Sequence, residues 1–403
     1  MKKSTKKKLV RTANRHPGAV IAVVVILVVL IAVGALLYFK VDSVHNAVDD
    51  LVKRFTASDV ENASGGKTSA PTFTTYGEND LSFHFLELGN AYTGDSVYIK
   101  AGEIDILIDA GSRQDSAEPI STYVNQYCTD GKLEYVIATH AHQDHIAGFV
   151  STKNNPGIFE RYECETIIDF ALTNAETAVY NNYVAARDAE PGAKHYTALE
   201  CYRESKEGAQ RVYSLGEGMS MTILYQEFYE KKTSDENDYS VCLLFTHGSK
   251  HYLFTGDLEK DGEASLVKNN ALPEVELFKA GHHGSYTAST DTLLSVIRPK
   301  IVCVCCCAGS TEYTSNTANT FPSQKFVDNV APYTDCVYVT TVVSVVYDEK
   351  KGKDVEKGVS MNGNITVLSS GGTVSVSCAN NDTKLKDTAW FKENRTCPAA
   401  WSS

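Results

Sequence analysis

The chain has 403 residues, of which 43% are apolar and 22% charged, and it carries 38 basic against 50 acidic side chains. This composition excludes wholesale disorder and collagen-like repeats, and the length suffices for one large domain or two ordinary ones. Seven of the basic residues lie within the first 15 positions, so the remainder has a net charge of −19. A generally basic surface for polyanions is therefore excluded, and a nucleic-acid contact would need a local basic patch or a metal.

The first predicted element is a membrane span. Residues 18–39 form an uncharged run of 22 residues dominated by Val, Ile, Leu and Ala. As a helix this run is about 33 Å long, and a hydrocarbon core is about 30 Å thick. A buried core helix and a cleavable signal peptide are the alternatives, but the run has no polar face and no clean small-x-small site follows it closely.

The charges around this run predict its orientation. We expect residues 1–17 to be a cytoplasmic basic segment, 18–39 to be a transmembrane helix, and 40–79 to be a stalk or linker that includes a short amphipathic helix over 41–56. The protein is then a single-pass protein of the cell membrane whose folded part, residues 80–378, lies outside the cytoplasm. Residues 379–403 are expected to be a polar C-terminal tail.

Apolar runs bounded by turn residues predict the elements of the folded part. Strands are expected over residues 82–88, 96–100, 104–108, 135–139, 166–170, 221–225, 240–246, 252–255, 275–279, 300–305, 363–368 and 373–378. Helices are expected over residues 116–127, 172–189, 259–269, 290–297 and 323–330. Strands that first form a meander and then alternate with helices suit an α/β sandwich of two sheets with helices outside.

A cluster of histidines follows one of these strands. Residues 139–145 read Thr-His-Ala-His-Gln-Asp-His, so three imidazoles and a carboxylate fall within six residues. Such groups are ligands for zinc, manganese or iron. In an extended loop His140 and His142 project the same way, and a tight turn lets Asp144 and His145 face a second ion. A polar surface loop without a metal is the alternative.

Two later strands end in further candidate ligands. Asp257 follows the apolar run 252–255, and His282 and His283 follow the strand expected over 275–279. One carboxylate can bridge two cations and reduce their mutual repulsion. Either motif alone would be weak evidence, because a Gly-Asp pair is usually a turn and a His pair is usually solvated. Their occurrence in this order after the histidine cluster predicts a shared metal centre.

These motifs resemble the metallo-β-lactamase-fold hydrolase superfamily. Within it the chain is most similar to the hydrolase domain of ComEC-type DNA-uptake competence proteins and their single-span relatives. The matching stretches are Phe85–Asn90 with Asp95, Leu107–Gly111, the histidine cluster, Asn237–Ser240, Thr255–Asp257 and Gly281–Ser285. The resemblance covers roughly residues 80–375 and implies an αββα sandwich with the site at one edge.

The resemblance also implies a role for each matching residue. His140 and His142 hold a first divalent ion, and Asp144, His145 and His282 hold a second, with Asp257 between the two; His283 is the alternative to His282. Asp144 and Asp257 are the predicted catalytic carboxylates, Asp109 orients the histidine loop by hydrogen bonds, and Ser285 is assigned to substrate oxygens. Zinc is the expected metal, with manganese as the alternative.

Two departures from the family pattern stand out. The superfamily often supplies a further histidine to the first ion. Here the candidates are His195, His247 and His251, or the ligand is absent, as in the ComEC-like subgroup. The Gly-His-Pro of that subgroup corresponds here to Thr320-Phe321-Pro322, so its histidine is missing. If that histidine assists a leaving group, its loss puts activity or substrate in doubt.

A divalent ion lowers the pKa of bound water from about 15.7 toward 7 and so supplies hydroxide near neutrality. The predicted function is therefore that of a metal-dependent hydrolase, a phosphodiesterase or nuclease-like phosphoesterase. His142 favours hydrolysis over redox chemistry, because the corresponding motif of the di-iron oxidoreductases in this superfamily has a carboxylate at that position. The expected substrate is a small or cell-surface phosphoester, with nucleic acid as the alternative, and no protein partner is evident. The other function class is a non-catalytic, membrane-tethered metal-binding module for surface binding or DNA uptake.

The 11 cysteines give two further expectations. Cys303, Cys305, Cys306 and Cys307 lack zinc-ribbon or Cys-x-x-Cys spacing, and we expect them to be small buried residues near the floor of the site. Cys378 and Cys397 flank the polar tail, and a disulfide between them would stabilise the fold by about 3 kcal/mol.

Overall fold

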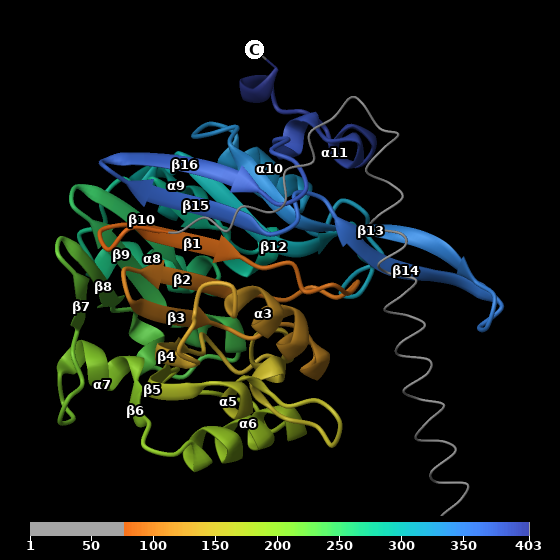
Figure 1. Ribbon diagram of the computed structural model, residues 1–403. Coiled ribbons are helices and arrows are strands. Elements are labelled where there is room, and N and C mark those ends of the chain that lie inside the picture. Colours follow the sequence, from red (N-terminus) through yellow and green to blue (C-terminus); the bar gives the residue numbers. More distant parts are fainter. Residues whose placement is uncertain (1–75, 403) are drawn as a thin grey trace, which may run out of the picture. The chain divides into compact units, whose positions relative to one another are not determined.

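Two eight-stranded sheets form the centre of the part of the chain that the structure describes. The computed structural model describes residues 76–402, and Figure 1 shows helices around the two sheets. The first sheet comprises, in spatial order, β16 (Thr373–Cys378), β15 (Ile365–Ser370), β1 (Leu81–Phe85), β2 (Val97–Ala101), β3 (Ile104–Ile108), β4 (Lys132–Ile137), β5 (Glu163–Asp169) and β6 (Lys194–Thr197). The second comprises β14 (Lys353–Ser360), β13 (Val337–Asp348), β12 (Ile301–Ala308), β11 (Leu277–Lys279), β10 (Lys250–Phe254), β9 (Cys242–His247), β8 (Met219–Leu224) and β7 (Val212–Gly216).

Aromatic side chains fill the space between the sheets. Phe83 of β1 lies 4.6 Å from the ring centroid of Tyr252 and 5.5 Å from those of Phe245 and Phe254, which belong to β9 and β10. All four side chains are buried. Burial of such large apolar groups contributes about 1.5–3 kcal/mol each, so this cluster holds the two sheets face to face.

Helices cover the outer face of the second sheet. Apolar side chains of α8 (Lys260–Asn269), α9 (Asp291–Ile297) and α10 (Gln324–Val330) pack in one buried cluster with residues of β10, β11 and β12. The remaining α-helices within residues 76–402 are α3 (Ala117–Val124), α4 (Gln143–Ile146), α5 (Ile158–Arg161), α6 (Ala178–Ala189), α7 (Ala198–Arg203) and α11 (Ala389–Asn394). The predicted two-sheet α/β architecture is confirmed for the described residues.

Each sheet contains a run of parallel strands, and these runs position the site. In the first sheet β3, β4, β5 and β6 are parallel neighbours, and in the second sheet β10, β11, β12 and β13 are. The carboxyl ends of parallel strands meet at one edge of a sheet, where ligand sites of open α/β folds usually lie. The predicted metal-ligating residues follow β4, β10 and β11, which places them at this edge.

Several elements were not predicted from the sequence. They are β6, β7 and the long hairpin of β13 and β14, which extends beyond the rest of its sheet in Figure 1. The segment expected to be a polar tail contains α11, and its Phe391 and Trp401 are buried. A short polar segment can therefore still contribute single large apolar side chains to the buried core.

One of the two predictions about the cysteines is confirmed, and the other is wrong. Cys303, Cys305, Cys306 and Cys307 are all buried in β12, as predicted. Cys378 and Cys397 are free thiols, so the predicted disulfide between them is wrong. Cys397 is exposed.

The predicted membrane span, residues 18–39, and the predicted amphipathic helix, residues 41–56, lie outside the described residues. Between residues 76 and 402, none of the helices has both the length and the apolar character that a bilayer crossing requires.

His84 is a fully buried imidazole of β1 within a group of tyrosines. Its ring lies 5.3, 5.6 and 4.9 Å from those of Tyr98, Tyr123 and Tyr127. Its two ring nitrogens lie 2.8 Å from the hydroxyls of Tyr123 and Ser82. Burial lowers the pKa of His84 to about 3, so the folded protein holds this imidazole neutral.

We expect His84 to make the protein less stable in mild acid. Its pKa is lower in the folded than in the unfolded chain, so its contribution is complete above pH 6.5 and is lost as the pH falls toward 3. Between pH 7.5 and pH 5 the loss is about 2 kcal/mol. Urea unfolding of wild type and His84→Gln at both pH values measures it. The wild type should lose about 2 kcal/mol more than the variant, and equal losses would contradict a neutral buried His84.

Candidate metal centre

Loops at the ends of four parallel strands bring the predicted site residues together. Asp109 directly follows β3, the histidine cluster follows β4, Asp257 follows β10, and His283 follows β11. Backbone hydrogen bonds join these loops: Val241 N donates to Thr139 O at 2.9 Å and His282 N donates to Gly256 O at 3.3 Å. The site is thus assembled from both sheets.

Left-handed backbone conformations aim several of these side chains. Asp109, His282 and His283 have φ values of 59°, 45° and 54°, which residues with a Cβ rarely adopt. Gly256, with φ of 54°, precedes Asp257, and a Cβ there would lie 2.8 Å from Ser240 Oγ. Strain of this kind persists only where the surroundings enforce it and is concentrated at functional sites.

Four buried side chains form the centre of the site. Ligand atoms of Asp95, His145, Asp257 and His283 all lie within 4.8 Å of one another. Asp257 Oδ2 is 3.0 Å from His145 Nε2 and 3.1 Å from His283 Nε2, and the two Nε2 atoms are 3.3 Å apart. We call these four residues the central cluster. Two imidazoles and two carboxylates are a donor set that suits a divalent cation.

Hydrogen bonds fix the orientation of both imidazoles. His145 Nδ1 lies 2.7 Å from Asp109 Oδ2, and His283 Nδ1 lies 2.9 Å from the carbonyl oxygen of Cys305. Each Nδ1 can donate its proton outward, which leaves the Nε2 lone pair directed into the cluster. A carboxylate or carbonyl behind a ligating histidine commonly has this role in metal sites.

Asp109 also organises the loop that carries the histidines. Its carboxylate accepts hydrogen bonds from Thr139 N and Thr139 Oγ1, both at 2.8 Å. The position of Asp109 therefore suits the role expected from the sequence, in which it orients the histidine loop rather than binding an ion.

The electrostatics of the cluster are dominated by buried carboxylates. Burial disfavours the imidazolium forms, but Asp257 with Asp109 raises the pKa of His145, and Asp257 with Asp95 raises the pKa of His283, each well above its usual value. Burial likewise opposes ionisation of Asp257, and the two imidazoles outweigh it and lower its pKa. The cluster therefore favours positive charge at its centre.

Asp144 and the first histidine pair lie beside the central cluster. Asp144 Oδ2 is 3.3 Å from His283 Nε2. His140 Nε2 is 3.0 Å from His142 Nδ1, and the rings of His140 and His145 are 4.2 Å apart. The structure thus brings together His140, His142, Asp144, His145 and Asp257.

The two histidines of the Gly-His-His-Gly motif lie in different surroundings. His283, the alternative in the sequence analysis, is fully buried and belongs to the central cluster. His282 lies at its edge, with Nε2 4.0 Å from Asp257 Oδ2 and Nδ1 3.1 Å from Glu259 Oε1. Ser285, predicted to contact substrate, is 2% exposed and lies 2.9 Å from Thr287 Oγ1 through its hydroxyl.

The three candidates for an additional first-ion ligand have other partners. His195 Nε2 lies 2.8 Å from Asp169 Oδ1, His247 Nδ1 lies 2.9 Å from Ser369 Oγ, and His251 Nδ1 lies 3.3 Å from Thr246 Oγ1. Both alternatives of the sequence analysis, an additional histidine ligand or none, therefore stay predictions.

The sequence analysis assigns no site role to three residues that the structure places in or beside the cluster. Asp95, which the family resemblance includes without a role, precedes β2, where that strand runs antiparallel beside the end of β3. Lys279 is the last residue of β11 and is 2% exposed. Tyr313 belongs to the loop after β12, and its hydroxyl donates to Asp144 Oδ2 at 2.8 Å. A charged residue at the end of an otherwise apolar strand was the available signal for Lys279.

Lys279 supplies a fixed positive charge beside the cluster. Its ammonium pairs with Asp95 Oδ2 and lies 3.8 Å from Asp257 Oδ1. Burial opposes the charged form, and both carboxylates outweigh it and raise the pKa of Lys279. Lys279 therefore compensates part of the negative charge that the carboxylates bring.

Comparisons with known proteins indicate a family for part of the chain. Residues 89–158 match the model of the metallo-beta-lactamase superfamily. The chain is 24% identical to ComE operon protein 3 of Bacillus subtilis over 251 residues, which are 57% of this chain and 28% of that protein. It is 38% identical to competence protein ComA of Neisseria gonorrhoeae over 72 residues, which are 18% of this chain and 10% of that protein.

Among solved structures, the metallo-beta-lactamase fold protein YhfI of Bacillus subtilis aligns with 65% of this chain and 96% of its own, at 11% identity and a TM-score of 0.38. The fold of this chain is a mixed α/β metallo-β-lactamase-like fold with two sheets. The chain is a metallo-β-lactamase-fold protein related to competence proteins, with a candidate divalent-metal site. It spans less than a third of the length of the curated relatives named above.

Loss of Lys279 should destabilise the metal-free protein. Lys279→Met leaves buried carboxylates without their cation, and breaking a buried pair in this way costs about 3–5 kcal/mol. Lys250→Met is the matched control, because Lys250 pairs with Glu276 at 2.7 Å nearer the surface and should cost about 1 kcal/mol or less. Urea unfolding in the presence of a chelator measures both. A cost for Lys279→Met no larger than that of the control would contradict the charge-compensating role.

Proposed function

We propose that this chain is a membrane-anchored, extracytoplasmic, metal-dependent hydrolase of phosphoester bonds, that is, a phosphodiesterase or nuclease-like phosphoesterase. The observation that carries the proposal is the convergence of His145, Asp257 and His283, whose ligand atoms lie 3.0–3.3 Å apart in a buried cluster. Asp257 Oδ1 is buried and has no hydrogen-bond partner among the described residues, which is the environment of an atom that a cation would satisfy.

The spacing of the ligand atoms supports two divalent ions. Ligands at 2.0–2.2 Å from a tetrahedral ion lie about 3.3 Å from each other. The three atoms above, at 3.0–3.3 Å, and the pair His140 Nε2 and His142 Nδ1, at 3.0 Å, all lie close to this spacing. His140 and His142 are proposed for the first ion, and Asp144, His145 and His283 for the second, with Asp257 between them. Zinc suits these donors best, and manganese is the alternative.

Bound divalent ions supply Lewis acidity and make water acidic enough to attack near neutral pH. The residues of this chain orient the ligating imidazoles and the attacking water. Asp109 and the Cys305 carbonyl hold the imidazoles of His145 and His283 with their Nε2 atoms inward. Asp257 Oδ1 is available to accept a hydrogen bond from the attacking water. The oxygen of that water bonds to phosphorus, the phosphorus–oxygen bond to the alcohol breaks, and the alcohol leaves with a proton.

The charge distribution favours a small or cell-surface phosphoester. Outside the first 15 residues the chain has a net charge of −19. A cavity of about 750 Å³ beside the loop after β12 is lined by as many lysines as carboxylates (Lys351, Lys353, Lys357 and Glu312, Asp354, Glu356). Neither feature forms an extended basic track for nucleic acid, which stays the alternative substrate. We propose no protein partner.

One observation favours the second function, a non-catalytic metal-binding module for surface binding or DNA uptake. Phe321 occupies the position of the Gly-His-Pro histidine of the ComEC-like subgroup. Its ring lies 5.7 Å from that of His282 and 5.8 Å from that of His283, so a phenyl group stands where an imidazole could have served the site. A phenyl group cannot transfer a proton.

Turnover and metal content separate the two functions. The purified protein should bind zinc or manganese and hydrolyse bis-p-nitrophenyl phosphate. Asp257→Ala and His142→Ala should each lower kcat/KM at least 100-fold, because removal of a ligand disturbs the ion that activates water. Elemental analysis and p-nitrophenolate absorbance are the measurements.

His247→Ala is the matched control, because His247 is paired with Ser369 and takes no part in the proposed site. It should retain both metal and turnover. Bound metal without hydrolysis of any phosphoester in a panel would establish the binding module instead. Persistence of turnover in Asp257→Ala would show that the site lies elsewhere.

The proposed topology predicts that Cys397 is accessible from outside the cell. Cys397 is an exposed thiol of the folded part, which the orientation of the predicted span places beyond the cytoplasm. A membrane-impermeant maleimide added to intact cells should label the wild type more strongly than Cys397→Ser. Labelling of Cys397 only after the cells are lysed would place the folded part in the cytoplasm and overturn the proposed topology.

A further inference from the structure

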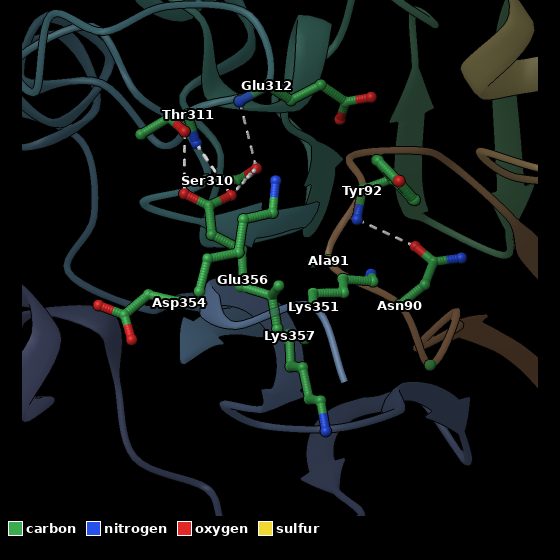
Figure 2. Close-up of a pocket in the computed structure, with 14 residues that line it drawn as sticks. Asn90, Ala91, Tyr92, Ser310, Thr311, Glu312, Lys351, Asp354, Glu356 and Lys357 are labelled. Atoms are coloured by element: carbon green, nitrogen blue, oxygen red, sulfur yellow. Dashed lines mark hydrogen bonds between the residues drawn. The ribbon is translucent and has the colours of Figure 1, made fainter. Parts of the chain in front are cut away.

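The loop between β12 and α10 is fixed at its beginning by two anchors. We call residues 309–322 the Tyr313 loop. Thr311 Oγ1 donates to Glu356 on β14 at 2.9 Å, and Ser310 Oγ donates to the same carboxylate at 3.3 Å (Figure 2). Glu312 accepts hydrogen bonds from Arg113 at 2.7 Å and from Thr93 N at 2.9 Å.

Arg395 fixes the end of the same loop. This arginine, which follows α11 and is 8% exposed, donates to the carbonyl oxygens of Thr317, Thr320 and Pro322 at 3.0, 2.7 and 2.8 Å. Charge-assisted hydrogen bonds of this kind are among the stronger ones in proteins. The Tyr313 loop is therefore held at both ends in a defined conformation.

Tyr313 extends from this loop to the predicted metal centre. Its hydroxyl donates to Asp144 Oδ2 at 2.8 Å, and this oxygen is itself 3.3 Å from His283 Nε2. The tyrosine is nevertheless 54% exposed. Its polar end lies beside the central cluster while its ring borders solvent.

Phe321 brings no hydrogen-bond donor to the side of the site next to Tyr313. Its ring lies against both His282 and His283 and 5.7 Å from the ring of Tyr313. It therefore fills the side of the site next to Tyr313 but offers no hydrogen-bond donor. Within residues 76–402, Tyr313 is the side-chain hydroxyl found to donate to Asp144.

We propose that Tyr313 is a substrate-binding residue whose hydroxyl donates to a non-bridging oxygen of the bound phosphoester and so supplies the hydrogen bond that Phe321 cannot. This inference rests on the proposed phosphoesterase function. A carboxylate oxygen and a phosphoryl oxygen are both anionic acceptors, so the donor that serves Asp144 in the free protein serves the substrate equally well.

Tyr313→Phe removes the hydroxyl and retains the ring, and Tyr347→Phe is the matched control. Tyr347 is 65% exposed and belongs to the β13–β14 hairpin. A hydrogen bond to a charged group contributes about 1.5–3 kcal/mol, so we expect Tyr313→Phe to lower kcat/KM for bis-p-nitrophenyl phosphate about 10- to 100-fold. The control should stay within twofold of wild type. Metal content and melting temperature should be unchanged in both variants.

Binding of dimethyl phosphate gives a readout that does not depend on turnover. Isothermal titration calorimetry of the metal-loaded protein should show a Kd at least fivefold weaker for Tyr313→Phe than for wild type. Unchanged binding and turnover would overturn the role of Tyr313 while leaving the phosphoesterase function intact. A loss of metal from the variant would also overturn it, because Tyr313 would then act through Asp144. A wild type that neither binds dimethyl phosphate nor hydrolyses a phosphoester would overturn both proposals.

A second substitution tests whether the two positions serve the same oxygen. Phe321→His restores a donor beside Tyr313. In the Tyr313→Phe background it should recover part of the lost kcat/KM, whereas in the wild-type background it should change kcat/KM less. Absence of any recovery would overturn the inference that Tyr313 replaces the missing donor.

Discussion

The burial of several carboxylates in one small volume is the constraint on which the rest of the site depends. Asp95, Asp109 and Asp257 are each 1% exposed, and Asp144 is 8% exposed. Carboxylates so close together repel one another, and burial removes the water that would screen them. Positive charge must therefore be present among them. Lys279 supplies one unit permanently, and protons on His145 and His283 or divalent cations supply the rest.

The scaffold meets this constraint with backbone geometry that is itself unfavourable. Asp109 and His283 have left-handed conformations, and Gly256 leaves no room for a side chain between Ser240 and Thr139. Each departure costs of order 1–3 kcal/mol unless the surroundings enforce it. Here the enforcement comes from the two sheets, whose aromatic interior holds the strand ends at fixed separations. The binding geometry is thus stabilised by the core between the sheets rather than by the site itself.

The sequence predicts the strand ends better than the loops. The motif after β4 and Asp257 after β10 could be found because an apolar run followed by ligand residues has a local signature. The distinction between His282 and His283 could not, because it depends on two consecutive left-handed residues that no periodicity reveals. Asp95 reaches the cluster only because β2 runs antiparallel beside β3, which is a property of the sheet. Loops, such as the one that carries Tyr313, are positioned by partners that are distant in sequence.

The same electrostatics limit where the binding energy for a substrate can come from. The surface is acidic overall, and the cavity beside the Tyr313 loop has balanced charge, so long-range attraction of an anion is weak. An anionic group must instead be held by short contacts at the cluster, where a buried environment strengthens each hydrogen bond and each ionic contact. For the phosphoester substrate proposed above, such contacts act on the phosphoryl group and its immediate neighbours. Selection of that substrate then depends on side chains beside the central cluster, where Tyr313 contacts Asp144 and Phe321 packs against His283.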